Sequence, residues 1–75
     1  MIGIPLVDAR GMRCPWPVVR LARAMREAPS PALVRIVADD PIAPGEIAAL
    51  AQERGWTVLP VQTDIGAGFE ISAPA

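Results

Sequence analysis

The stretch Ile4-Pro5-Leu6-Val7-Asp8-Ala9-Arg10-Gly11-Met12-Arg13-Cys14-Pro15-Trp16-Pro17 contains the signals that decide the fold. Its first six residues form a short apolar run that ends at charged residues, which predicts a strand. Gly11 can adopt a positive φ, so a loop is expected to follow the strand. The two prolines near the end of the stretch are tolerated in the first turn of a helix but not in its interior. The stretch therefore predicts a strand, a loop and a helix start, with Cys14 at about the N-cap.

The rest of the chain continues this alternation of strands and helices. Beyond the stretch, apolar residues recur at helical spacing until Pro29. Gly55 is expected to end a second helix, and Pro60 predicts that the following strand lies at an edge or contains a bulge. Pro44 and Gly45 are unusual in the first turn of a helix. The expected elements are a strand at 4–9, a helix at 15–28, a strand at 32–38, a helix at 41–54, a strand at 56–61, a turn at 63–68 and a strand at 69–73.

This order of elements, β-α-β-α-β-β, predicts an α/β fold of the α+β two-layer sandwich type. Two helices would cover one face of a four-stranded mixed sheet. A right-handed crossover makes the first two strands parallel, so both helices begin at the same edge of the sheet. Cys14 and the pair Asp39-Asp40 should therefore lie close together at that edge. The 75 residues are expected to form a single domain over residues 1–75.

The composition indicates a globular protein of a reducing compartment. The chain is 52% hydrophobic with a net charge of −1, whereas disordered chains are poor in apolar residues and highly charged. It has one cysteine and no histidine, which excludes an internal disulfide and a zinc site. The N-terminus lacks a basic start and a long apolar run, and no segment approaches the ~20 residues of a membrane helix. We expect a cytoplasmic protein without a membrane contact.

Charge is unevenly distributed along the chain. Residues 1–30 carry a net charge of +3 and residues 31–75 a net charge of −4. The arginines at positions 20, 23 and 26 fall on the outward face of the first predicted helix. They could meet an acidic partner surface, or they could simply form a solvated helix face. No aromatic stripe accompanies them, so direct nucleic-acid binding is not expected.

Cys14 is the candidate reactive residue. A lone cysteine is usually a small buried hydrophobe, but Cys14 lies in a polar loop-to-helix junction beside Arg13. Because the positive end of a helix favours a thiolate, we expect the pKa of this thiol to be lowered. A dithiol motif would need a second cysteine at the position of Pro17, and a nucleophile for acyl transfer would need a base such as histidine. The chemistry left is that of a carrier thiol, which receives a group and passes it on.

The run from Asp8 to Pro17 resembles the signature of the TusA (SirA-like) family. It matches every fixed position of the pattern D-x-x-G-x-x-C-P-x-P, and Asp39-Asp40-Pro41 also resembles the family. The resemblance implies a sulfur carrier that takes sulfane sulfur as a persulfide on Cys14 from a cysteine desulfurase or rhodanese-like protein. An acceptor protein would then receive the sulfur for tRNA thiolation, molybdenum-cofactor assembly or sulfur oxidation. If such a carrier is classed as an enzyme, it is a sulfurtransferase, and no cofactor or metal is implied.

The candidate site residues fall into two groups around the catalytic Cys14. Asp8 is expected to accept loop N–H groups and so to orient the cysteine loop; the alternative is a role as a proton acceptor. Gly11 is expected to meet a backbone requirement of the loop. Trp16 is either a docking anchor, as tryptophans often are at interfaces, or a core residue. The motif residues that support the cysteine are Asp8, Gly11, Arg13, Pro15 and Pro17; the residues expected to bind a partner are Trp16, Arg20, Arg23 and Asp40.

Two other functions remain open from the sequence. The first is a binding or regulatory module that uses the arginine-rich first helix and transfers no sulfur. The second is a thiol redox sensor, although this chain has no second cysteine to resolve an oxidised thiol. The carrier hypothesis requires a protein donor and a protein acceptor, and we expect the chain itself to be a monomer.

Overall fold

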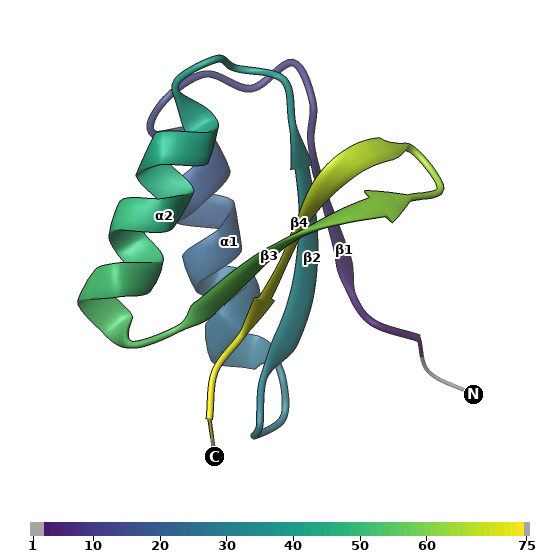
Figure 1. Ribbon diagram of the computed structural model, residues 1–75. Coiled ribbons are helices and arrows are strands. Elements are labelled where there is room, and N and C mark those ends of the chain that lie inside the picture. Colours follow the sequence, from purple (N-terminus) through teal and green to yellow (C-terminus); the bar gives the residue numbers. More distant parts are fainter. Residues whose placement is uncertain (1–2, 75) are drawn as a thin grey trace.

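The computed structural model describes residues 3–74 and shows two helices packed on one face of a four-stranded sheet (Figure 1). The predicted two-layer fold and its element order are confirmed. Met1, Ile2 and Ala75 lie outside the described residues. The two ends of the predicted domain, and the start of the N-terminal segment in which no targeting signal was expected, therefore lie outside them as well. The elements are β1 (Leu6–Ala9), α1 (Trp16–Glu27), β2 (Leu33–Ala38), α2 (Ala43–Arg54), β3 (Thr57–Thr63) and β4 (Gly66–Ser72).

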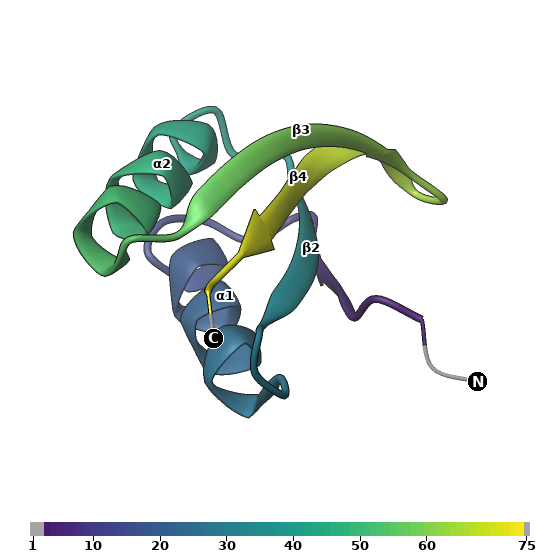
Figure 2. The same ribbon diagram turned by 60° about the horizontal axis from the view of Figure 1, so that its bottom comes forward.

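The sheet has the strand order β1-β2-β4-β3, so β2 and β4 are central. β1 pairs with β2 in parallel, whereas β4 is antiparallel to both β2 and β3. The predicted parallel pair and the edge position of the strand that contains Pro60 are therefore confirmed. Figure 2 shows α1 and α2 on the same side of the sheet, and the turn of the β3–β4 hairpin extends away from both helices.

The hydrophobic core lies between the helices and the inner face of the sheet. Leu21 of α1 and Ile47 of α2 are almost fully buried against Ile36 and Ile71 of the two central strands. Their positions follow the helical and the alternating periodicity of the sequence. Within residues 3–74, neither helix is long and apolar enough to cross a membrane.

The starts of both helices differ from the prediction. α1 begins at Trp16 with Pro15 as its N-cap, so Cys14 lies one residue before the N-cap. α2 begins at Ala43 rather than at residue 41, because a turn precedes it in which the Ala43 N–H donates to the Asp40 carbonyl at 2.9 Å. Gly55 ends α2 as predicted, with a φ of 74°.

The last two strands are longer than predicted, and the turn between them contains only two residues. The turn is tight because Gly66 has a φ of 123°, a value that favours glycine. The Thr63 hydroxyl also donates to the Gly66 carbonyl at 2.7 Å and accepts the Ile65 N–H at 3.2 Å. Residues 66–68, predicted to be part of a turn, therefore belong to β4.

Candidate functional site

Two loops lie side by side at one end of the molecule, at the top of Figure 1. One connects β1 to α1, and the other connects β2 to α2. The Gly11 N–H of the first loop donates to both carboxylate oxygens of Asp39 in the second, at 2.9 and 3.1 Å. The Cys14 N–H donates to Oδ2 of Asp40 at 2.9 Å. These bonds confirm that Cys14 lies beside the pair Asp39-Asp40.

Asp40 holds both loops with one carboxylate. Its second oxygen, Oδ1, accepts the Ile42 N–H at 3.0 Å, in the turn just before α2. The N–H groups of Ile42 and Cys14 stabilise the charged carboxylate and lower the pKa of Asp40. The partner-binding role predicted for Asp40 stays a prediction, but both oxygens of this carboxylate are engaged within the chain.

Gly11 shows why the first loop needs glycine. Its φ of 79° lies in the left-handed region, where residues with a Cβ are strained. This conformation directs its N–H to Asp39. Gly11 therefore adopts the positive φ that the sequence allowed at this position.

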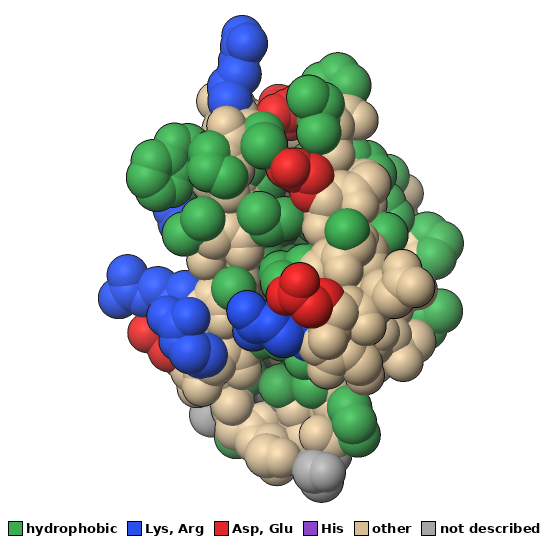
Figure 3. Space-filling model, turned by 90° about the vertical axis from the view of Figure 1, so that its left-hand side faces the viewer, with side chains coloured by type: hydrophobic (Ala, Val, Ile, Leu, Met, Phe, Trp, Pro, Cys, Tyr) green, Lys and Arg blue, Asp and Glu red, His purple; other side chains and the backbone are tan. Residues whose placement is uncertain are grey.

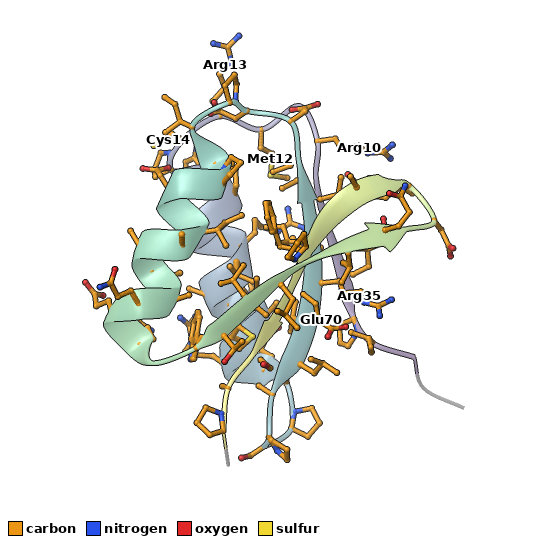
Figure 4. The ribbon with its side chains drawn as sticks, in the orientation of Figure 1. Arg10, Met12, Arg13, Cys14, Arg35 and Glu70 are labelled. Atoms are coloured by element: carbon orange, nitrogen blue, oxygen red, sulfur yellow. The ribbon has the colours of Figure 1, made fainter. Side chains whose placement is uncertain are left out.

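Cys14 is an exposed free thiol at the junction of this loop with α1 (Figure 4). The peptide bond between Cys14 and Pro15 is cis. Figure 4 shows that the Arg13 side chain extends away from the body of the protein and not toward the sulfur. Nearby apolar side chains reach solvent: Trp16 is 59% exposed, and so is Ile42 at the start of α2. Cys14 thus combines an accessible sulfur with a backbone fixed by Asp40.

The pKa of the Cys14 thiol is raised, not lowered as predicted. The largest cause is a hydrogen bond to the Glu46 carboxylate of α2, followed by some loss of hydration and by the charges of Glu46 and Asp40. The prediction was wrong because it counted only the positive end of α1. Here the Cys14 N–H is bonded to Asp40, and the negative charges of Asp40 and Glu46 favour the protonated thiol, which raises its pKa.

Asp8 lies in β1, just before the cysteine loop, and binds Arg10. Its Oδ1 accepts the Arg10 N–H at 3.2 Å, and both of its oxygens accept the Arg10 guanidinium at 2.8 and 2.9 Å. The hydrogen bond from the Arg10 side chain is the main reason that the pKa of Asp8 is lowered to about 2. Asp8 therefore accepts one loop N–H, that of Arg10, while Asp39 and Asp40 accept those of Gly11 and Cys14.

The remaining predicted residues lie on α1. Pro17 is buried in the core, whereas Trp16 is exposed, which rules out the alternative that Trp16 is a core residue. Arg20 and Arg23 are exposed, and Arg23 pairs with Glu27 at 3.2 Å. Figure 3, which views the face that carries both helices, shows basic and apolar side chains next to one another on this surface.

Two residues of the site were not predicted from the sequence as site residues: Asp39 and Glu46. Asp39 was predicted to lie near Cys14, but its bond to Gly11 spans 28 positions of the chain. Glu46 carried no signal in the sequence. Within residues 3–74, no three His, Cys, Asp or Glu side chains are grouped so that they could hold a metal ion. The arrangement can supply one nucleophile and must obtain its reactants from outside.

We expect Asp40→Asn to weaken the hold on the cysteine loop. The asparagine amide offers one acceptor oxygen for the two N–H groups that Asp40 binds. The midpoint of urea unfolding at pH 7 should therefore fall. Because the pKa of Asp40 is lowered in the folded protein, its stabilising effect is complete above the unfolded pKa of ~3.9 and is lost as the pH falls through the folded pKa. The variant should accordingly lose less stability than wild type on acidification.

The matched control for this prediction is Asp64→Asn, in the exposed β3–β4 turn. It makes the same change of charge and should leave the midpoint close to that of wild type. Equal midpoints for Asp40→Asn and Asp64→Asn would show that the Asp40 bonds do not stabilise the fold.

Comparisons with known proteins agree with this fold. The sequence profile of the family described as sulfurtransferase TusA matches residues 6–72. A protein of Archaeoglobus fulgidus, named as a candidate sulfur carrier, is 41% identical over 53 residues, which cover 71% of this chain and 69% of the relative. YrkI of Bacillus subtilis, also named as a candidate sulfur carrier, is 36% identical over 61 residues, 81% of this chain and 80% of the relative. The crystal structure of a SirA-like protein from Desulfitobacterium hafniense superposes with a TM-score of 0.79 at 26% identity, covering 96% of this chain and 100% of that one.

Proposed function

Because the chain belongs to the TusA sulfurtransferase family, we propose that it is a sulfur carrier that accepts sulfane sulfur as a persulfide on Cys14. The observation that carries the proposal is the setting of Cys14. It is an exposed thiol, the chain has no other cysteine, and its backbone is held by Asp40 at the tip of the molecule. A thiol that is accessible and fixed in place suits a group that two partner proteins must reach in turn.

The transfer needs only the Cys14 thiol and the persulfide of the donor. The Cys14 sulfur attacks the outer sulfur of a donor persulfide, R–S–SH, and a new S–S bond forms as the S–S bond of the donor breaks. The donor leaves as a thiolate and takes up the proton that Cys14 loses. The products are Cys14–S–SH and R–SH, with no net oxidation or reduction. The same step in the other direction, with an acceptor thiol as the nucleophile, unloads the carrier.

The partners in this relay are proteins. We propose that a cysteine desulfurase or rhodanese-like protein loads Cys14, and that an acceptor in tRNA thiolation, molybdenum-cofactor assembly or sulfur oxidation unloads it. The exposed Trp16 would serve as an apolar anchor beside the sulfur. Arg20 and Arg23, exposed on the same helix, would speed the encounter with an acidic partner surface.

The proposal predicts that the wild-type protein gains one sulfur atom on its thiol. The protein is incubated with a cysteine desulfurase and cysteine, and its intact mass is measured before and after treatment with a reductant. We expect a mass increase of about one sulfur atom, which the reductant removes, because a persulfide is cleaved by thiols. Protein whose Cys14 has been blocked with iodoacetamide is the control and should gain nothing.

The proposal would be overturned if neither a cysteine desulfurase nor a rhodanese loaded sulfur onto protein whose thiol still reacts with iodoacetamide. That result would favour the binding module predicted as the alternative.

A further inference from the structure

The outer face of the sheet, opposite the two helices, carries no helix within residues 3–74 (Figure 2). Strand register places one residue of each strand in a row across this face, because Arg35 pairs with Leu6 on one side and with Glu70 on the other. Glu70 in turn pairs with Leu59. Successive side chains of a strand point to opposite faces, and the neighbours of these residues include core residues such as Ile36. We call the four residues the outer row; in the order of the strands it reads Leu6, Arg35, Glu70, Leu59.

The ends of the outer row are apolar and its centre is charged. Leu6 is 39% exposed and Leu59 is 53% exposed, although a sheet face that meets water usually carries polar side chains. Between them, Nε of Arg35 donates to Oε1 of Glu70 at 3.0 Å. Figure 4 shows this pair on the side of the sheet away from the helices. Exposed leucines on a face of this kind are typical of an interaction site.

The two ends of the outer row differ in shape. At one end, Ile4, Leu6 and Arg35 line a cavity of about 150 Å³ together with residues 62–64 at the end of the β3–β4 hairpin. This cavity has room for an aliphatic side chain. At the other end, Leu59 is exposed on the edge strand β3. The row therefore has a hole at one end and an exposed leucine at the other.

A two-fold axis parallel to the strands makes this face complementary to itself. When two copies pack face to face about such an axis, the ends of the row are exchanged, so each Leu59 meets the partner's Leu6 and its cavity. The same rotation places each Arg35 opposite the partner's Glu70. Because every contact in a two-fold interface occurs twice, the charges at the centre form a square of alternating sign. Complementary charges of this kind suppress other registers.

We propose that the chain forms a two-fold symmetric dimer through the outer face of its sheet, with a second copy of itself as the partner. Each Arg35–Glu70 pair is already hydrogen bonded within its own chain, and the opposite charge of the partner offsets its loss of hydration. Both helices and the Cys14 loop stay outside the interface, so the dimer presents two thiols to other proteins.

This inference goes beyond the proposed sulfur chemistry and does not depend on it. The monomer expected from the sequence stays a prediction, and measurements of association decide between the two. Sulfur loading enters neither of the tests, so a failure of loading counts against the carrier function alone.

The first test measures association and its dependence on the apolar end of the row. Sedimentation equilibrium of the full chain over a range of concentrations gives the dissociation constants of wild type, Leu59→Thr and Val19→Thr. Threonine removes apolar contact but suits a strand. Val19→Thr is the matched control, since Val19 is 46% exposed on α1, on the helical side of the molecule. Circular dichroism melting curves establish that each variant is folded.

We expect wild type to dimerise, and Leu59→Thr to raise the dissociation constant roughly tenfold or more, because it removes the side chain that fills the partner's cavity. Val19→Thr should keep the wild-type value. A wild-type protein that stays monomeric up to ~1 mM would overturn the proposal and leave the outer face to a different protein or to water. An equal effect of the two variants would also overturn it, because association would then not depend on the outer face.

The second test examines the register of the two copies. The double variant Arg35→Glu/Glu70→Arg exchanges the two charges, so it keeps the ion pair within the chain and the alternating charges of its own dimer. A mixed dimer of wild type with this variant would place like charges opposite each other at both positions. We therefore expect each protein to dimerise by itself and the mixed dimer to be rare.

The two proteins have the same mass, so one is labelled with a heavy nitrogen isotope before they are mixed, and native mass spectrometry then counts the three dimers. Random exchange would make half of all dimers mixed, whereas the proposal predicts a fraction well below half. Random mixing would overturn the proposed face-to-face arrangement, as would a double variant that is folded but monomeric.

Discussion

Replacing Gly68 with alanine is expected to lower the free energy of unfolding by ~3 kcal/mol or more, which would leave the folded state only marginally stable. Gly68 is buried in the central strand β4. A Cβ at this position would overlap the Ile36 carbonyl oxygen and approach Cγ2 of Val37 to 2.9 Å. The carbonyl belongs to the backbone of β2, so it can move only if the β2–β4 pairing is disturbed. A chain of 75 residues has a stability on the order of ~5 kcal/mol, so this loss is large.

Gly45→Ala provides the matched control. Gly45 lies in the first turn of α2, and a Cβ there would meet nothing within 4 Å. Since alanine favours a helix over glycine by up to ~1 kcal/mol, this variant should be as stable as wild type or slightly more stable. Urea unfolding followed by circular dichroism compares the two variants. If Gly68→Ala kept the wild-type midpoint, the close packing of β4 against β2 would be wrong.

The fold was largely predictable because its signals are local. Alternating and helical periodicities, together with Gly55 and Pro60, were enough to predict six elements and a mixed sheet. The start of α2 was not predictable in the same way. It depends on Asp40, whose carboxylate binds the Ile42 N–H while also holding a loop far away in the sequence. A local pattern cannot show that one side chain serves two segments.

The same distinction between local signals and contacts between distant segments applies to the site. Cys14 could be identified from the sequence because buried cysteines usually lie among apolar residues, whereas Cys14 lies between a charged residue and a proline. The direction of its pKa shift was predicted wrongly, because that direction depends on which charged side chains face the sulfur. Glu46 is remote from Cys14 in the sequence, and it raises the pKa of the thiol in a fold whose two loops are joined by Asp39 and Asp40. Tertiary contacts thus decide the reactivity of a residue that the sequence alone could identify.

Cys14→Ser is expected to fold like wild type and to accept no sulfane sulfur. The thiol is exposed and fills no part of the core, so serine should change the melting temperature little. The bond to Asp40 comes from the backbone N–H, which the substitution retains. A hydroxyl, however, cannot form the S–S bond that defines a persulfide, so the loss of loading should be complete.

Intact mass after incubation with a cysteine desulfurase and cysteine measures this loss directly. Wild type should gain about one sulfur atom, and Cys14→Ser should keep its original mass although it melts at nearly the same temperature. A labile sulfur on the serine variant would mean that another group of the chain takes it up. Because this chain has no second cysteine, such a result would argue against a covalent carrier and for sulfur that is bound without a persulfide bond. If instead only wild type is loaded and both proteins are folded, the sulfur atom of Cys14 is the one that accepts the transferred sulfur.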